Sequence, residues 1–386
     1  MKRINILVLV VLLITMIYSP VYAEQLEVIQ ASDDKDIVES KANILTYEDA
    51  VELAISKSTT LKSMSLDIDK ALEKRNKANE TVGFFSLDAE NNAGYFSLGG
   101  NVADALVSSS VNGLIALDRQ WQISQKNYDL EKEKIAYKVL TAYHNVLKAQ
   151  RDVDVATNAL ETAVQDNKII DLKNQYGLAS SFEKTQANQA LIAANDAIKS
   201  KQAALDTKYL ELNKMLSIDN IKDKVLVATT VMTDINNFDL ETHISRIKNS
   251  SPTVWMFEQQ AYLAQLSVDN YTFNQNTYDT YKVKKIEAEA ARDSVNVHKQ
   301  QLEDGMRSIY AGIEELESAY QELVTMEETL QKTYNNTKLL VDLGLVAKIE
   351  LIKLEEQLNS LEVQKFHLTS QHQQLVYTLN KPWVMS

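Results

Sequence analysis

Apolar residues recur with alternating steps of four and three along a segment that ends at Gly177. We call this pattern the first seam. Its members are Ile135, Val139, Ala142, Val146, Ala149, Val153, Ala156, Leu160 and Ala163. An apolar period of 3.5 residues sustained over this length predicts a long helix that packs against a partner helix along one face.

A second seam repeats the first one 167 residues later and ends at Gly344. Its apolar members are Leu302, Met306, Ile309, Ile313, Leu316, Tyr320, Leu323, Leu330, Tyr334 and Val341. Only Glu327 and Thr337 interrupt it. After each glycine an apolar helical pattern returns, and the two copies therefore predict two antiparallel helical hairpins in tandem.

Each seam stops at a Gly-Leu turn, which is the most closely copied part of the repeat. The two turns read Tyr176-Gly177-Leu178-Ala179-Ser180 and Leu343-Gly344-Leu345-Val346-Ala347. Glycine ends a helix readily because the left-handed conformation carries no penalty without a Cβ atom. The leucine that follows either packs against its own turn or contacts a partner protein, and the pattern leaves both interpretations open.

The stretch 83–113 breaks the helical pattern, because it holds five of the nine glycines. Phe85, Leu87 and Ala89 alternate with polar residues, which predicts a short β-hairpin that turns at Asn91-Asn92 into 95–98. The second half lacks this insert, since the repeat starts (Leu45 and Phe238) lie 193 residues apart. We therefore expect nearly continuous helix from Pro252 to Leu343.

The predicted fold is all-α, with long antiparallel helical hairpins in two tandem repeats and at most a short β-hairpin in the first half. A short strand is also possible between Val225 and Val231. We divide the chain into a signal peptide at 1–23, a flexible acidic lead-in at 24–44, a first helical repeat at 45–216 containing the glycine-rich insert, a connector at 217–237 and a second helical repeat at 238–382. Thr46 and Asp49 form a capping pair at the first helix start.

Residues 1–23 have the features of a signal for export: Lys2 and Arg3, an apolar core, and Val21-Tyr22-Ala23 as a cleavage pattern. An uncleaved N-terminal anchor is the alternative. The chain has no cysteine, which excludes disulfides and thiolate metal sites. Without Lys2 and Arg3 it carries 38 basic against 53 acidic residues, so we expect no nucleic-acid partner.

The sequence offers no catalytic or metal constellation, and we expect neither an enzyme nor a cofactor. None of the five histidines pairs with another at helical spacing. They are His144, His243, His298, His367 and His372. His372 falls on a seam, which predicts a packed histidine. Acids such as Glu314 and Glu315 are expected on a solvated helix face.

Several of these motifs together resemble the TolC-like outer-membrane efflux protein family. They are Leu45-Thr46-Tyr47-Glu48-Asp49-Ala50-Val51 with Ser58-Thr59-Thr60-Leu61, the counterpart Ser250-Ser251-Pro252-Thr253-Val254, Ala142-Tyr143, Tyr310, and the two Gly-Leu turns. The resemblance covers roughly residues 44–382. It implies a homotrimer whose hairpins form a coiled-coil α-barrel, a hollow duct in the cell envelope.

The resemblance also implies roles for the turns. They would form tips that dock a periplasmic adaptor working with an inner-membrane pump, through Gly177, Leu178, Ala179, Ser180, Gly344, Leu345, Val346 and Ala347. Acids beyond the tips would line a constriction, and the sixth residue past each glycine is Glu183 or Glu350. The ninth is Gln186 or Lys353, which does not support an acidic ring at that level.

The family pattern places the protein in the outer membrane through a β-barrel, but a membrane-spanning strand needs about 9 to 11 residues. The first half offers one hairpin of short arms and the second half none, so we expect an incomplete barrel. Two functions follow as hypotheses: an efflux or secretion conduit that docks an adaptor, or a structural coiled-coil scaffold of the envelope that transports nothing.

Overall fold

The structure is a computed structural model of the chain. It describes residues 44–91, 100–228, 232, 235, 238–271 and 280–385, with side chains at all of them except 83–91 and 100–108. The predicted signal peptide and nearly all of the acidic lead-in lie outside these residues. Residues 46–222 and 228–386 form one helical unit, and the small sheet described below belongs to a second unit.

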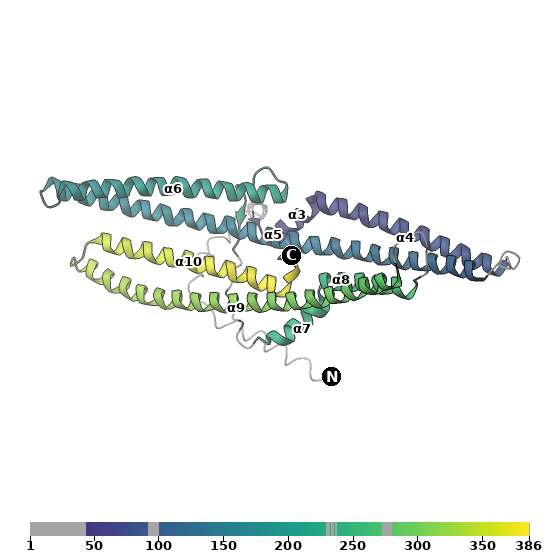
Figure 1. The fold of residues 1–386 in the computed structure, drawn as a ribbon. Helices are drawn as coiled ribbons and strands as arrows, with labels where there is room; N and C mark the ends of the chain where they lie inside the picture. Colours follow the sequence, from purple (N-terminus) through teal and green to yellow (C-terminus); the bar gives the residue numbers. More distant parts are fainter. Residues whose placement is uncertain are drawn as a thin grey trace, which may run out of the picture. The chain divides into compact units, whose positions relative to one another are not determined.

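Within the described residues the helical unit contains eight α-helices and a short C-terminal 3₁₀ helix, which confirms the all-α prediction (Figure 1). The helices are α3 (Tyr47–Lys57), α4 (Thr59–Asn91), α5 (Gly100–Gln175), α6 (Ser181–Leu216), α7 (Leu240–Ser250), α8 (Pro252–Asp269), α9 (Tyr281–Asp342), α10 (Lys348–Asn380) and η3 (Pro382–Met385).

Four long helices form a layer in the order α6, α5, α10, α9. The chain reverses between α5 and α6 and again between α9 and α10, so each pair is a hairpin, and α5 packs against α10 to join the two hairpins (Figure 1). Helices α3 and α4 continue along α5, while α8 packs on α9 and α5. Both Gly-Leu turns lie at the same end of this layer (Figure 1).

The main core lies away from the turns, where α5, α7, α9, α10 and η3 meet. Its buried members are Leu130, Ile244, Ile247, Met306, Ile313, Leu379, Trp383 and Val384. The predicted seams supply part of it, since Met306 and Ile313 are fully buried. Toward the turns the seams are only half-buried: no side chain of α9 after Ile313 is buried, and none of α6 before Tyr209.

The second unit contains two strands of two residues each, one at the start of the first repeat and one in the connector that follows it. Strand β1 (Ile44–Leu45) pairs in parallel with β2 (Val225–Leu226), with Ile44 opposite Val225 and Leu45 opposite Leu226. The strand expected to start at Val225 is therefore present in its first two residues. Residues 229–231 lie outside the described part.

The strand predicted at Phe85–Ala89 is wrong, because α4 continues as helix to Asn91. Two short arms make an unstable hairpin on their own, whereas extending an existing helix needs no new nucleus. The predicted turn after Asn91 and the second arm lie outside the described residues up to Gly99, and 100–113 belongs to α5. The first helix is also divided, since Ser58 separates α3 from α4.

The continuous helix predicted from Pro252 to Leu343 is also wrong. Helix α8 ends at Asp269, and α9 begins after Thr280, whose hydroxyl accepts a hydrogen bond from the Val283 amide at 3.2 Å. Asn270 bonds back to the Leu266 carbonyl at 3.0 Å. Such short polar side chains favour helix ends over helix interiors. No described helix is long and apolar enough to cross a membrane.

Candidate functional site

The first Gly-Leu turn closes α5 with a complete pair of reverse hydrogen bonds. The Gly177 amide donates to the Asn174 carbonyl at 3.0 Å, and the Leu178 amide donates to the Lys173 carbonyl at 2.7 Å. Gly177 has φ +71°, in the left-handed region. This is the Schellman arrangement that satisfies the last carbonyls of a helix.

The second turn repeats the same geometry at the end of α9. The Gly344 amide donates to the Val341 carbonyl at 2.9 Å, and the Leu345 amide donates to the Leu340 carbonyl at 2.9 Å. Gly344 also has φ +71°. The prediction that both glycines terminate helices in the left-handed conformation is confirmed, and we call the two turns tip 1 and tip 2.

The helices that leave the tips begin differently. At tip 1, the Ser180 hydroxyl accepts from the Glu183 amide at 3.2 Å, and the Glu183 carboxylate accepts from the Ser180 amide at 2.7 Å. This capping box holds the start of α6, and the bond from the Ser180 amide lowers the pKa of Glu183. At tip 2, the N-cap is Ala347, which forms no side-chain cap.

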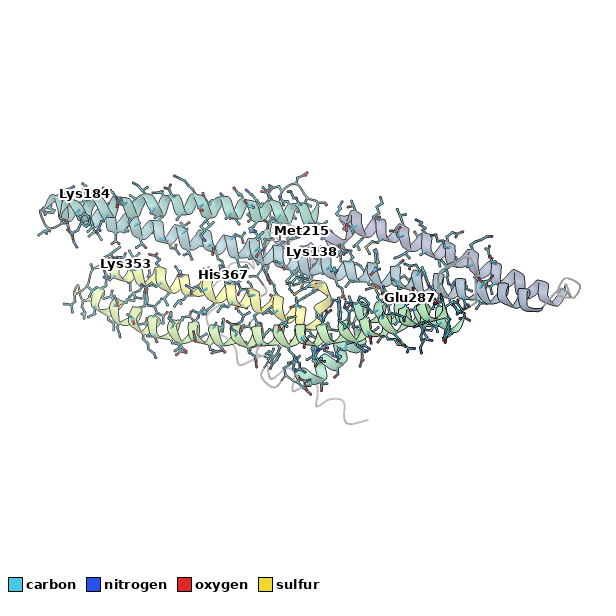
Figure 2. All side chains as sticks on the ribbon, viewed as in Figure 1. Lys138, Lys184, Met215, Glu287, Lys353 and His367 are labelled. Atoms are coloured by element: carbon cyan, nitrogen blue, oxygen red, sulfur yellow. The ribbon has the colours of Figure 1, made fainter. Side chains whose placement is uncertain are left out.

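Two further contacts brace tip 1. The side-chain amide of Asn174 donates to the Ala179 carbonyl at 2.9 Å. Lys184 (Figure 2) pairs with Asp171 at 2.8 Å across the hairpin. In the second copy the positions equivalent to Asn174 and Lys184 are Val341 and Leu351. Neither side chain can form such a bond, so tip 2 lacks these braces.

Large apolar side chains are exposed at both tips. Leu178 is 77 % exposed and Leu345 70 % exposed. The other exposed members are Leu172, Tyr176 and Phe182 around tip 1 and Leu339, Leu340 and Leu343 around tip 2. Each tip is therefore a rigid turn that presents an apolar surface.

The two acids considered for a constriction are both exposed, but they have different local partners. Glu183 caps α6, as described above. Glu350 lies 3.7 Å from Lys353, which also pairs with Asp166 of α5 at 3.3 Å (Figure 2). Lys353 therefore joins the two hairpins close to the tips.

A second set of charged contacts joins the hairpins farther from the tips. Asp152 of α5 lies 2.9 Å from Lys201 of α6 and 3.2 Å from His367 of α10 (Figure 2). Arg151 stacks on the Phe366 ring at 3.8 Å and approaches Glu362 at the same distance. Burial lowers the pKa of both His367 and the nearby Lys148. The contacts between the hairpins were not predicted from the sequence, because the partners lie 211 to 215 residues apart along the chain.

The histidines form structural contacts. His372 is fully buried and lies 3.0 Å from Glu317, as expected for a packed histidine. His144 is also buried, and burial lowers its pKa to about 4. Among the described residues, no group of three or more metal-ligating side chains comes together.

Comparison with known proteins links this architecture to a class of membrane proteins. No protein-family model matches the sequence, and no curated protein matches it either. Solved structures do match over most of the chain. The CusC structure, described in terms of folding and transmembrane channel formation, superposes with a TM-score of 0.62 at 13 % identity, covering 87 % of this chain and 91 % of that one.

The outer-membrane channel OprN superposes with a TM-score of 0.61 at 12 % identity, covering 88 % of this chain and 90 % of OprN. The CmeC outer membrane channel of Campylobacter jejuni gives a TM-score of 0.57 at 12 % identity, with 87 % and 85 % coverage. The chain has the fold of outer-membrane channels. This channel fold spans nearly the whole length of each relative, and these relatives are channels rather than enzymes.

Proposed function

We propose that this chain is a component of an efflux or secretion conduit in the cell envelope. Copies of it assemble into a helical duct, and the duct docks an adaptor protein through tips 1 and 2. The adaptor in turn works with an inner-membrane pump. The observation that carries this proposal is the exposure of Leu178 and Leu345 on two turns of identical backbone geometry.

The geometry of the tips argues against a purely local role for these leucines. In a Schellman turn the residue after glycine commonly packs on the helix three positions before its C-terminal cap. For Leu178 that position is Lys173, and for Leu345 it is Leu340, itself 40 % exposed. Both turns are closed by backbone hydrogen bonds while the leucines stay in solvent. A partner that covers one leucine fully would gain roughly 1.5 to 3 kcal/mol.

The layer of four long helices supports assembly with further copies. Helices α6 and α9 form its two edges, and each carries small exposed side chains at steps of seven residues. These are Ala193, Ser200 and Thr207 on α6, and Ala311, Ser318 and Thr325 on α9. The threonine hydroxyls bond to carbonyls of their own helices, which leaves methyl groups toward solvent. Joining the α9 edge of one copy to the α6 edge of the next is a head-to-tail contact, and it forms a ring when the rotation between copies is a whole fraction of a full turn.

The docking proposal is tested with the double variant Leu178→Ser with Leu345→Ser and a purified helical-hairpin adaptor from the same organism. We expect binding in calorimetry to weaken at least tenfold, with little change in melting temperature. Leu66→Ser is the matched control, because Leu66 is 63 % exposed on α4, away from the tips. Unchanged adaptor affinity in the double variant would mean that the tips only reverse the chain.

The assembly proposal is tested by disulfide crosslinking, since the natural chain has no cysteine. Ser200 and Thr325 lie at similar distances from the tips, roughly 27 Å at 1.5 Å per residue. We expect Ser200→Cys with Thr325→Cys to give covalent dimers and trimers under oxidising conditions. The control pairs Ser200→Cys with Ala311→Cys. Ala311 lies on the same α9 edge as Thr325 but about 20 Å farther from the tips, so this pair should not crosslink.

A structural scaffold remains the competing function. It predicts that the tip variant and a deletion strain leave drug susceptibility and secretion unchanged while envelope spacing changes. The conduit proposal requires the opposite result, namely loss of export in both strains.

A further inference from the structure

Lysines and exposed apolar side chains gather at the start of α9, at the end of the hairpin opposite tip 2. We call residues 281–286 the lysine collar. Lys282, Lys284 and Lys285 are three of its six members. Tyr281 is 53 % exposed and Ile286 55 % exposed, and Val283 is exposed as well. A chain with net charge −13 therefore concentrates positive charge and apolar surface at one point.

Helix stability does not explain these lysines. The N-terminal end of a helix favours acidic side chains and disfavours cations, and α9 has no acid in its first turn. Lys284 pairs with Glu287 at 3.0 Å, near the start of α9 (Figure 2). Lys282 and Lys285 form no ion pair with any described residue. Both side chains are exposed.

Packing does not explain the apolar members either. Ala288 is buried and marks the face of α9 that packs in the hairpin with α8. Lys282 and Ile286 are one turn apart and lie on the opposite face. Within the described residues, the Tyr281 ring meets the Tyr271 ring edge-on, with centroids 5.7 Å apart. This face presents amines next to an aliphatic and an aromatic side chain.

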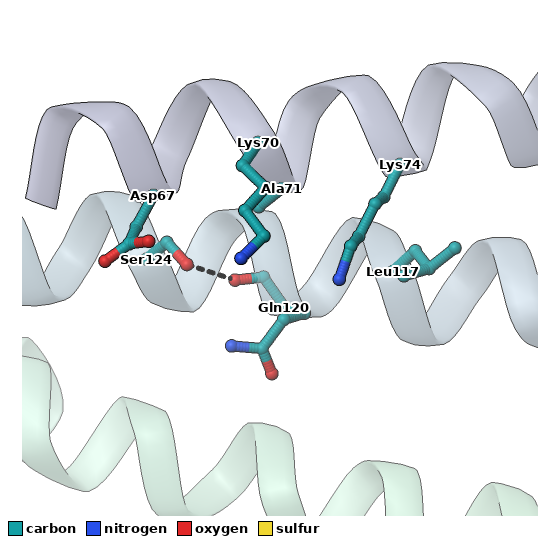
Figure 3. A pocket seen from close by; sticks show the side chains of 7 residues that line it. All are labelled: Asp67, Lys70, Ala71, Lys74, Leu117, Gln120 and Ser124. Carbon is teal, nitrogen blue, oxygen red and sulfur yellow. Dashed lines mark hydrogen bonds between the residues drawn. The ribbon is translucent and has the colours of Figure 1, made fainter.

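A second pair of amines lies on the neighbouring hairpin of α4 and α5. Lys70 and Lys74 overhang a pocket of about 320 Å³ that is also lined by Gln120 and Leu117 (Figure 3). Neither lysine forms an ion pair with a described residue. Asp67 also lines this pocket (Figure 3), while Asp118 on α5 is bonded to Arg75 at 2.9 Å and to Gln122 at 2.8 Å.

Contacts between α4, α5 and α8 place the two lysine groups in the same part of the helical unit. Asp118 holds Arg75 of α4, and the adjacent Arg119 lies over the Tyr262 ring of α8 at 5.3 Å. Lys70 and Lys74 precede Arg75 on α4 and lie on the side of this level toward α3, whereas the collar lies on the other side, where α9 begins after the end of α8. Amines therefore lie on two hairpins on either side of this level, and α4 and α5 extend beyond both groups (Figure 1).

We propose that the lysine collar binds the surface of an anionic lipid bilayer. The ammonium groups of Lys282 and Lys285 contact headgroup phosphates. Tyr281, Val283 and Ile286 enter the boundary between headgroups and acyl chains. Tyrosine and lysine are typical of this boundary, because each combines an apolar body with a polar end.

The test is flotation of the full chain with vesicles of phosphatidylcholine alone and of phosphatidylcholine with phosphatidylglycerol. We expect binding to the anionic vesicles only. Lys282→Gln with Lys285→Gln should weaken that binding roughly 30-fold, about fivefold for each lysine near a charged surface. A separate double variant, Tyr281→Ser with Ile286→Ser, should also bind the anionic vesicles more weakly than the natural chain does. Its dependence on sodium chloride concentration should be unchanged.

Lys168→Gln with Lys338→Gln is the matched control, since it removes the same charge near the tips and should leave binding unchanged. Equal binding to both kinds of vesicle, or an unaltered affinity in the collar variant, would overturn the proposal. So would displacement by inorganic phosphate at constant ionic strength, which would indicate a site for free phosphate. A changed sedimentation mass without a change in vesicle binding would instead assign the collar to contacts between copies.

Discussion

Gly177 and Gly344 occupy the same backbone conformation, and the space around them is open. A Cβ atom added at either glycine would meet no other atom within 4 Å. The requirement for glycine at the tips is therefore conformational rather than steric. This distinction can be measured at the scale of single residues.

Gly177→Ala and Gly344→Ala should each lower the free energy of unfolding by about 1 to 2 kcal/mol, the cost of a left-handed conformation for an L-residue. Chemical denaturation followed by circular dichroism measures this loss. Gly305→Ala is the control, because Gly305 lies within α9 and also has open space around it. It should instead raise stability by about 0.5 to 1 kcal/mol. A loss at Gly305 as large as at the tips would contradict the explanation.

At the scale of helices, the two hairpins differ most in how their returning helices start. Helix α6 has a complete capping box, whereas α10 starts at an alanine. The third position of α10 is nevertheless Glu350, the residue type that completes a capping box. Tip 2 therefore lacks the N-cap hydroxyl that Ser180 supplies to the capping box at tip 1.

Restoring that hydroxyl should stabilise tip 2. We expect Ala347→Ser to raise the free energy of unfolding by about 1 kcal/mol and Ser180→Ala to lower it by a similar amount. Hydrogen exchange of the first-turn amides of α6 and α10 reads the effect locally. Equal protection of the two helix starts in the natural chain would contradict the difference in capping.

The packing of α5 against α10 should depend on pH through His144. Burial lowers the pKa of this histidine to about 4, although the backbone of Ser370 acts in the opposite direction. The unfolded chain, with a histidine pKa near 6.5, binds more protons between these values. Stability is therefore complete above pH 6.5 and falls by up to about 1.4 kcal/mol per pH unit as pH drops toward 4.

Thermal denaturation from pH 4 to 7 measures this dependence. His144→Gln should flatten the change of melting temperature over that range, and Thr157→Ala, an exposed substitution on the same helix, should leave it as in the natural chain. An unchanged slope in His144→Gln would assign the effect to other groups.

The helix starts and ends also show what the sequence could and could not reveal. Local signals worked where side chain and backbone bond within a few residues, as at Thr46 with Asp49 or at the tip glycines. Apolar spacing gave the long helices correctly. The end of α8 was missed because Asn270 and Thr280 interrupt the pattern by local capping rather than by glycine or proline.

The contacts between hairpins were beyond sequence reasoning for a different reason. The sequence pattern does not distinguish Asp152 and His367 from other polar residues on helix surfaces. Their proximity depends on the register of α5 against α10, which no local signal sets. The docking and constriction residues remain predictions of the sequence, now with defined geometry at the tips.

At the scale of the whole molecule, the seams of α6 and α9 are only half-buried toward the tips in a single copy. If neighbouring copies cover the α6 and α9 edges, stability must depend on concentration. We expect the melting temperature to rise by several degrees between micromolar and hundred-micromolar protein. Thr207→Glu with Ser318→Glu, which charges both edges, should remove this dependence while leaving the dilute protein folded. A melting temperature independent of concentration would contradict assembly through these edges.

The contact of the C-terminal segment with α5 has a consequence for the order of folding. Each hairpin is made of helices that are neighbours in sequence, so each can form early and on its own. By contrast, Glu133 of α5 bonds to Lys381 at 3.0 Å and to the Trp383 indole, contacts that span about 250 residues. Because Trp383 and Val384 are also core members, this connection forms only after the last residues have emerged. A chain that stops a few residues short would keep two hairpins but would lose this contact between α5 and the C-terminal segment. The contact therefore distinguishes the full-length chain from a truncated one.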